Sequence, residues 1–228
     1  MTVGFHRPSE GSVLYRAGGT IVLCTASVDD KVPPFLDGKG QGWLTAEYQM
    51  HPRANPRRQD RDGRGKALGG RSQEIQRLVG RALRAAVHLE KLGTRTITID
   101  CDVLEADGGT RTASITGGFV ALALALSKIG ARALREPVAA TSVGLLDPGL
   151  LALDLCYIED SKARVDLNVV ATASGKIVEI QGTAEGAPVE RKEVDAMVDL
   201  ALVGITKLAQ VQRDALARAG VDLARLAG

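Results

Sequence analysis

Short stretches typical of strands recur in the first part of the chain, and in the last of them, residues 96–104, apolar and polar residues alternate. Strict alternation places every second side chain on the same face, which is typical of a strand with one buried face. These stretches lie at residues 12–15, 20–27, 43–50 and 96–104. Gly18 and Gly19, between the first two, predict a hairpin turn.

Apolar residues spaced three and four apart predict three helices. The first covers residues 72–92, with Ser72 as its N-terminal cap and Gly93 at its C-terminal end. The others cover residues 115–129 and 189–219. Between them, strands are expected at residues 138–146, 150–157, 164–172 and 176–182. Two β-rich stretches that each lead into helices predict an α+β fold, which we expect to form one domain over residues 1–228.

A strand, a glycine turn and a helix follow one another within residues 96–118. The turn contains Gly108 and Gly109, and Thr110 and Arg111 stand just before the helical run. Free N–H groups at the start of a helix, together with a fixed guanidinium group, form a binding site for an anion. We expect this anion to be a phosphate.

Residues 53–71 are strongly basic, although the whole chain has a formal net charge of only +2. Pro56 and four glycines disfavour regular structure there, and Asp60 and Asp62 are the only acidic residues. The basic residues are Arg53, Arg57, Arg58, Arg61, Arg64, Lys66 and Arg71. Such a segment is either a solvated surface loop or a contact for nucleic acid, and the second is favoured by arginine, which binds phosphate in a bidentate manner.

Asp160 and Asp166 form a second chemical signal. We expect Asp160 in the turn after one strand and Asp166 early in the next, so that a hairpin brings both carboxylates to one end of a sheet. Such a pair can bind Mg²⁺ together with a substrate phosphate, or one carboxyl with a raised pKa can act as a general acid. Solvation of a tight turn is the third explanation, and the strand position of Asp166 weakens it.

The composition limits the remaining possibilities. The chain has 45% hydrophobic and 25% charged residues, no apolar run that could span a bilayer, and no apolar core of a secretion signal at its start. Cys24, Cys101 and Cys156 lack the spacing of a zinc site, so we expect buried free thiols in a reducing cytosol. Trp43 and Tyr48 are expected in the core or at an interface rather than on a nucleobase.

Five long and idiosyncratic runs identify a family, at residues 32–54, 69–87, 95–119, 154–170 and 178–188. In these runs the chain resembles the ribonuclease PH family of phosphorolytic exoribonucleases over nearly its whole length. The resemblance implies a fold of the ribosomal protein S5 domain 2-like type with duplicated β-α halves. It also implies a homo-hexameric ring built as a trimer of dimers. A shorter N-terminal segment and a shorter linker before Pro137 depart from the family. Neither removes a matched site residue, and the first bears on an edge strand and the subunit contacts.

The resemblance also assigns roles to individual residues. Arg71, Gly109, Thr110 and Arg111 would bind phosphate, and Asp160, Asp166 and Arg111 would be catalytic. The two aspartates would also be the ligands of Mg²⁺. The residues that would contact tRNA near the subunit contacts are Arg53, Arg57, Arg58 and Arg61.

The implied activity is phosphorolysis of RNA in the 3′→5′ direction in the cytoplasm. Inorganic phosphate would be the co-substrate, tRNA precursors and also rRNA would be trimmed, and nucleoside 5′-diphosphates would be released in a reversible reaction. One alternative is a non-catalytic RNA-binding subunit of an exosome-like ring, and another is a plain RNA-binding module. The presence of Arg71, Arg111, Asp160 and Asp166 favours the enzyme.

Overall fold

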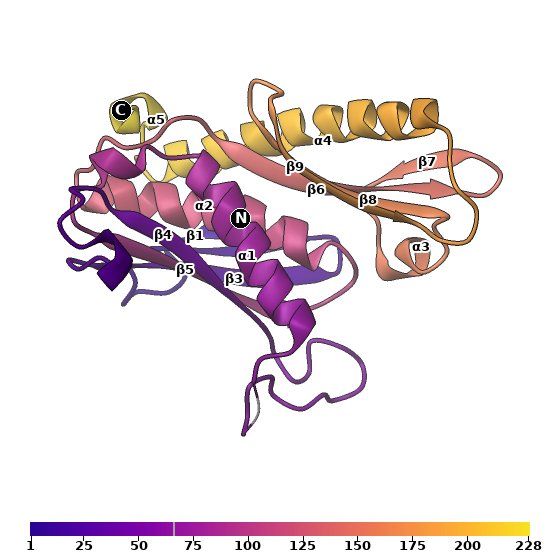
Figure 1. Ribbon diagram of the computed structural model, residues 1–228, viewed down its shortest axis with the longest axis horizontal. Coiled ribbons are helices and arrows are strands. Elements are labelled where there is room, and N and C mark those ends of the chain that lie inside the picture. The colour runs from indigo at the N-terminus through magenta and orange to yellow at the C-terminus, as the bar shows by residue number, and fades with distance from the viewer. Residues whose placement is uncertain (66) are drawn as a thin grey trace.

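Nine strands form two sheets in the computed structural model, which describes residues 1–65 and 67–228 (Figure 1). The first sheet has five strands in the order β1-β2-β3-β5-β4. They are β1 (Thr2–Val3), β2 (Gly11–Ala17), β3 (Thr20–Asp29), β4 (Trp43–Met50) and β5 (Thr96–Glu105). Neighbouring strands are antiparallel, except that β4 runs parallel to β5. These elements confirm the four strands predicted for this part of the chain, including the hairpin at Gly18 and Gly19.

Two helices, α1 (Gly70–Ala85) and α2 (Thr110–Lys128), cover one face of the first sheet. The apolar residues of β5 that the alternation predicted, Ile97, Ile99 and Val103, are completely buried under them. Close packing is possible because Gly118 of α2 leaves room for Leu83 of α1 and for Ile99. Helix α2 is apolar on all sides, which is expected of a helix enclosed in a core.

The second sheet has four antiparallel strands in the order β7-β6-β8-β9. They are β6 (Val138–Leu146), β7 (Leu150–Leu153), β8 (Val165–Thr172) and β9 (Ile177–Ala184), and the long helix α4 (Arg191–Arg218) packs on one face. The amide of Gln212 on α4 donates to the carbonyl oxygens of Thr116 and Val138, at 3.0 and 2.9 Å. This buried side chain therefore fastens α4 to both α2 and β6.

The first helix is shorter than its apolar spacing predicts. It ends at Ala85, and a 3₁₀ turn follows at Leu89–Lys91. Val87 forms a β-bridge with Leu134, and the His88 N–H donates to the Ala133 carbonyl, so a tertiary contact ends the helix. The predicted caps are also wrong, because Gly69 precedes the helix and Ala86 follows it.

The segment after β7 differs from the prediction as well. The strand stops at Leu153, Asp154 adopts a left-handed conformation with φ of 60°, and a short helix α3 (Tyr157–Asp160) follows. Strand β8 pairs with β6 and β9 rather than with β7, so the predicted hairpin is wrong. Cys156 immediately precedes α3 and is half-buried, whereas Cys24 and Cys101 are buried as expected.

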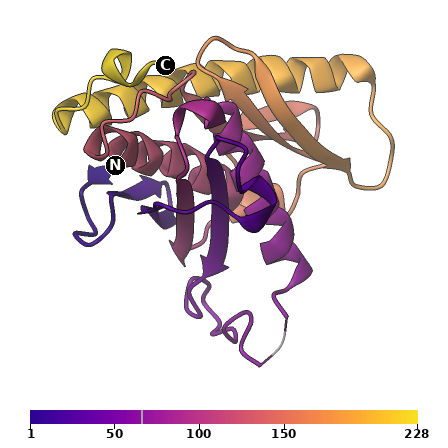
Figure 2. The same cartoon turned by 60° about the vertical axis from the view of Figure 1, so that its left-hand side comes forward.

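The basic segment between β4 and α1 projects from the rest of the molecule, as two views show (Figures 1 and 2). Its described residues form turns and bends only, as the prolines and glycines predict, and Lys66 lies outside the described residues. The C-terminus ends beside a short helix, α5 (Leu223–Leu226). None of the helices within residues 1–65 and 67–228 is long and apolar enough to cross a membrane.

Candidate active site

A cavity of about 340 Å³ lies where the first half of the chain meets the second. Its walls come from the basic loop, the starts of α1 and α2, helix α3 and strands β6 and β8. Six residues that the sequence assigns to phosphate or metal all line it, namely Arg71, Gly109, Thr110, Arg111, Asp160 and Asp166. Residues separated by almost a hundred positions therefore meet in one place.

Two helices begin at the wall of this cavity. Helix α2 begins at Thr110 after Gly109, and helix α1 begins at Gly70, one residue before Arg71. At the start of α1 the Asp62 carboxylate accepts from the Gly69 N–H at 2.8 Å, whereas no side chain of the described residues caps the start of α2. The N–H groups of the first turn of α2 are therefore left for a ligand, and the helix dipole favours an anion there.

The turn before α2 requires glycine at two successive positions. Gly108 and Gly109 have φ of +81° and +56°, which is the left-handed region. A Cβ atom on Gly108 would also collide with the carbonyl oxygen of Leu155, so the two halves of the chain touch at this point. The hydroxyl of Thr20 donates to the Gly108 carbonyl at 2.6 Å and holds the turn from the other side.

Arg111 is held in place by side chains from two elements. Its guanidinium group lies 3.7 Å from the carboxylate of Glu74 on α1, and it donates to the amide oxygen of Gln181 on β9 at 3.3 Å. The Gln181 amide nitrogen in turn donates to Glu179 at 3.0 Å, and Glu179 forms a two-point ion pair with Arg81 of α1. This chain of contacts orients the Gln181 amide and so directs Arg111 along the cavity wall.

The carboxyl group of Asp166 is destabilised in its ionised form. Burial and the neighbouring Asp160 carboxylate raise its pKa, while Arg111 and a hydrogen bond from Asn168 act in the opposite direction. The Asn168 amide lies 3.4 and 3.5 Å from the two carboxylate oxygens. Asp160 ends helix α3 instead of lying in a turn between paired strands, yet it is close enough to Asp166 to influence its charge.

The two carboxylates of the cavity have the chemistry that suits Mg²⁺. The described part of the chain contains no group of three or more His, Cys, Asp or Glu side chains that could hold a metal ion. Mg²⁺, however, is usually held by one or two carboxylates together with water and substrate phosphate. Asp160 and Asp166 match that donor set, and a cation between them would relieve the cost of ionising Asp166.

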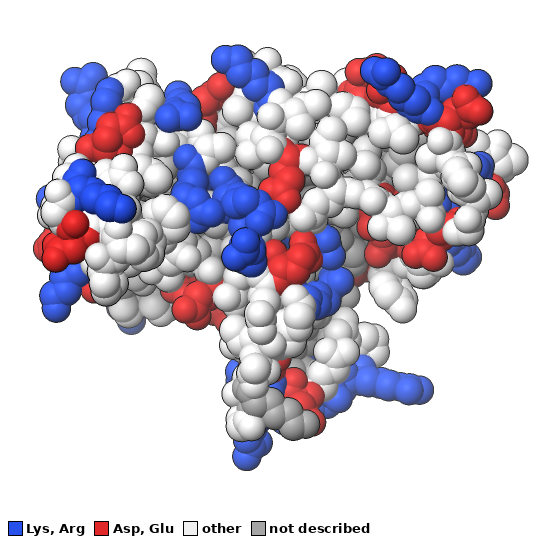
Figure 3. Space-filling view, viewed as in Figure 1, with Lys and Arg blue, Asp and Glu red and all other residues white. Residues whose placement is uncertain are grey.

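The arginines assigned to RNA lie on the projecting loop and do not line the cavity. Arg53, Arg57, Arg58 and Arg61 are exposed, and Figure 3 shows basic side chains extending from this part of the surface. Arg58 forms an exposed ion pair with Asp60. Burial raises the pKa of Asp102 on β5, and Arg61 is close enough to oppose this rise. The loop residues that do reach the cavity are Asn55 and Gln59.

Sequence reasoning missed three side chains at or beside the cavity. Glu74 and Gln181 contact Arg111, and Tyr157 exposes its ring in the cavity wall. Glu74 follows Arg71 by one helical turn, a spacing that places both side chains on the same helix face and could have pointed to it. Gln181 and Tyr157 carry no such signal because their approach depends on the packing of the two halves.

Comparison with known proteins identifies the family. Residues 1–128 match the model of domain 1 of the 3′ exoribonuclease family, RNase PH, and residues 136–204 match the model of domain 2. These matches and the two sheets define a two-domain α+β protein of the RNase PH fold. The chain belongs to the 3′ exoribonuclease family, as the resemblance in its sequence predicts.

Solved structures share this fold at low sequence identity. Rice (Oryza sativa) Rrp46 is similar with a TM-score of 0.76 and 16% identity, over 93% of this chain and 91% of that chain. A chain of the Archaeoglobus fulgidus exosome with RNA bound to the active site is similar with a TM-score of 0.75 and 20% identity. That likeness covers 92% of this chain and 85% of the other. At these identities the likeness establishes the fold alone.

Proposed function

We propose that this protein is a phosphorolytic 3′→5′ exoribonuclease that trims the 3′ ends of tRNA precursors and of rRNA. The observation that carries the proposal is the single cavity in which two arginines, an uncapped helix start and two aspartates face one another. Phosphorolysis needs this combination, because free phosphate and the terminal phosphodiester repel each other and must be brought into contact. Both family domains form the cavity wall, so we treat the chain as one catalytic unit.

The phosphate ion would bind between Arg71, Arg111 and the N–H groups that begin α2. These groups offset its charge and direct one of its oxygens at the terminal phosphorus atom. A new P–O bond forms there, the bond to the 3′ oxygen of the preceding nucleotide breaks, and that oxygen takes the proton of hydrogen phosphate. The products are a nucleoside 5′-diphosphate and an RNA shorter by one nucleotide. One phosphate link replaces another, so the reaction is reversible.

Asp160 and Asp166 would lie opposite the attacking phosphate, beside the scissile link. They would hold Mg²⁺, which when bound offsets charge on the reacting phosphate groups. In the alternative without a metal ion, the raised pKa of Asp166 suits a protonated carboxyl that gives its proton to the leaving oxygen and regains one from hydrogen phosphate. The exposed arginines of the projecting loop would grip the RNA backbone without regard to sequence. A cytoplasmic homo-hexamer is part of this proposal and rests on the family resemblance.

The test is an incubation of the purified protein with a tRNA precursor that has a single-stranded 3′ end, with and without inorganic phosphate. Nucleoside diphosphates should appear only with phosphate, and Arg111→Ala should abolish them. Arg191→Ala is the matched control, since Arg191 lies on the outer surface of α4 with its side chain 92% exposed. Equal activity of the Arg111 variant and the control contradicts the assignment of the site.

A second candidate function is that of a non-catalytic RNA-binding subunit in an exosome-like ring, because a chain of an exosome shares this fold. The same incubation separates the two functions. Tight RNA binding without release of nucleoside diphosphates, at any phosphate concentration, would establish the non-catalytic subunit. The complete set of arginines and aspartates around the cavity favours the enzyme.

A further inference from the structure

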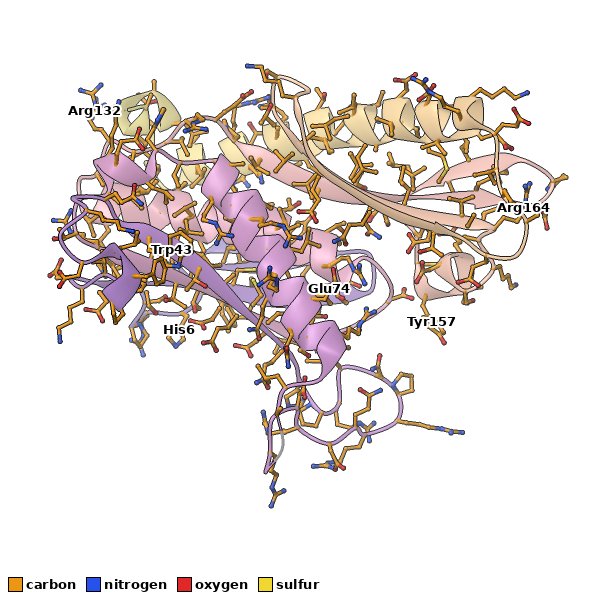
Figure 4. The ribbon with its side chains drawn as sticks, viewed as in Figure 1. His6, Trp43, Glu74, Arg132, Tyr157 and Arg164 are labelled. Carbon is orange, nitrogen blue, oxygen red and sulfur yellow. The ribbon has the colours of Figure 1, made fainter. Side chains whose placement is uncertain are left out.

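An aromatic ring stands exposed at the mouth of the proposed active site. Tyr157 is 66% exposed, yet it lines the same cavity as Arg111 and Asp166. It is the one aromatic residue among the described residues of the cavity wall. Figure 4 shows its side chain pointing away from the ribbon of α3.

The other aromatic residues considered for stacking are already occupied. Tyr48 is buried, and its hydroxyl group lies 2.9 Å from that of Thr110. Trp43 packs edge-on against Phe35 with 5.4 Å between the ring centres, and the Arg84 guanidinium lies 4.8 Å from its ring. Tyr157 has neither kind of contact in the described structure, so a face of its ring is left for a ligand.

The backbone that carries Tyr157 is fixed at both ends. The Tyr157 N–H donates to the carboxylate of Asp107 at 3.1 Å, and its carbonyl accepts from the Ser161 N–H at 3.0 Å. The preceding N–H, of Cys156, donates to Glu159 at 3.0 Å. Asp107 directly precedes the glycine turn, so the backbone of Tyr157 is tied to the proposed phosphate site. Only the two side-chain torsions of Tyr157 then remain to be ordered when a ligand stacks on its ring.

We propose that Tyr157 is the stacking surface for the 3′-terminal nucleobase of the RNA, an inference that rests on the proposed function. A nucleotide whose phosphate faces Arg111 and Asp166 carries its base one ribose away, within the same cavity. The ligand is any of the four nucleobases, because each has an aromatic face, and purines bind more tightly than pyrimidines because that face is larger. Asn55 and Gln59 at the root of the basic loop supply amide groups to the same cavity.

The test uses single-stranded RNA with 2-aminopurine at its 3′ end, because stacking quenches the fluorescence of this base. Measurements are made in the Asp166→Asn background without phosphate, so that the RNA stays intact. Tyr157→Ala should abolish the quenching and weaken RNA binding roughly 5- to 150-fold, the range for loss of one stacked base. Tyr157→Phe keeps the ring and should retain both. Phe5→Ala removes an aromatic residue that is 52% exposed outside the cavity and should change neither.

A second measurement separates this inference from the proposed function. In the background that retains Asp166, Tyr157→Ala should raise the KM for RNA and leave the KM for phosphate unchanged. Quenching that persists in Tyr157→Ala overturns the inference, and so does an equal rise of both KM values, which indicates collapse of the site. If the parent protein releases no nucleoside diphosphate, the proposed function fails, but the fluorescence measurement still decides the role of Tyr157.

Discussion

The glycine turn before α2 allows a prediction whose size follows from the structure. Gly108→Ala adds a single Cβ atom at a residue with φ of +81°. The left-handed conformation costs an L-residue about 1–2 kcal/mol. The Cβ atom would also overlap the Leu155 carbonyl oxygen and lie 3.0 Å from the Cys156 carbonyl carbon, and backbone atoms cannot rotate away as a side chain can. Overpacking of this kind costs about 1–3 kcal/mol.

The sum is a loss of about 3 kcal/mol in the free energy of unfolding, or roughly 6–12 °C in Tm for a chain of this size. Gly18→Ala is the matched control, because Gly18 has φ of +54° and its Cβ atom would meet nothing within 4 Å. The control therefore carries the conformational cost without the collision. Thermal and denaturant unfolding measure both variants, and phosphate binding should weaken only in the first. If Gly108→Ala is no less stable than Gly18→Ala, the two halves do not touch at this turn.

Three further changes test other parts of the site. Asp166→Asn should abolish phosphorolysis and stabilise the protein near neutral pH, because the raised pKa of Asp166 means that its ionisation is disfavoured in the folded state. The gain in the free energy of unfolding should shrink as the pH falls toward 3.8, which unfolding measured at several pH values would show. Replacement of both Arg57 and Arg58 by Gln should reduce the slope of log K against log salt concentration by about 1.4 for single-stranded RNA. Fluorescence anisotropy measures this slope, and an unchanged slope would exclude both arginines as phosphate contacts. Gln181→Leu removes the 3.3 Å hydrogen bond from Arg111 and should raise the KM for phosphate about tenfold with little effect on kcat. Initial rates that show only a fall in kcat would contradict the role of Gln181 in positioning Arg111.

Local patterns predicted the regular elements well. Strands β4 and β6 cover the expected residues, since alternation and continuous apolar character both reflect burial in a sheet. The pattern gave the wrong end for α1 because Val87 continues the apolar spacing, although its backbone pairs with Leu134. Periodicity reports which side chains are buried, and a buried residue beyond a helix end looks the same as one within it.

The region from Asp154 to Asp160 shows a different limit. An aspartate at φ of 60° ends β7, and no composition rule indicates that position. The helical turn that follows is stabilised by Glu159, three residues after Cys156, a spacing typical of a capping box. Cysteine is not a usual cap, so the spacing alone did not predict the helix. Asp160 and Asp166 nevertheless line one cavity, because β8 and α3 both meet the glycine turn there.

The positions of Glu74, Gln181 and Tyr157 could not be predicted because they depend on how the halves dock. Each lies on a different element, and the contacts of Gln181 and Tyr157 reach 70 and 50 positions along the chain. The sequence specifies these contacts only through the complete fold. The family resemblance supplies the residues that we propose to carry the chemistry, and the structure adds those that contact them.

The contacts at the cavity also join the two domains to each other. Three contacts cross between the halves. They are the close packing of Gly108 against the Leu155 carbonyl, the hydrogen bond from the Tyr157 N–H to Asp107, and the ion pair of Arg81 with Glu179. A slight separation of the domains would therefore dismantle the pocket while leaving each sheet intact. Moderate heating should abolish the phosphorolytic activity reversibly, several degrees below the temperature at which circular dichroism detects any loss of helix.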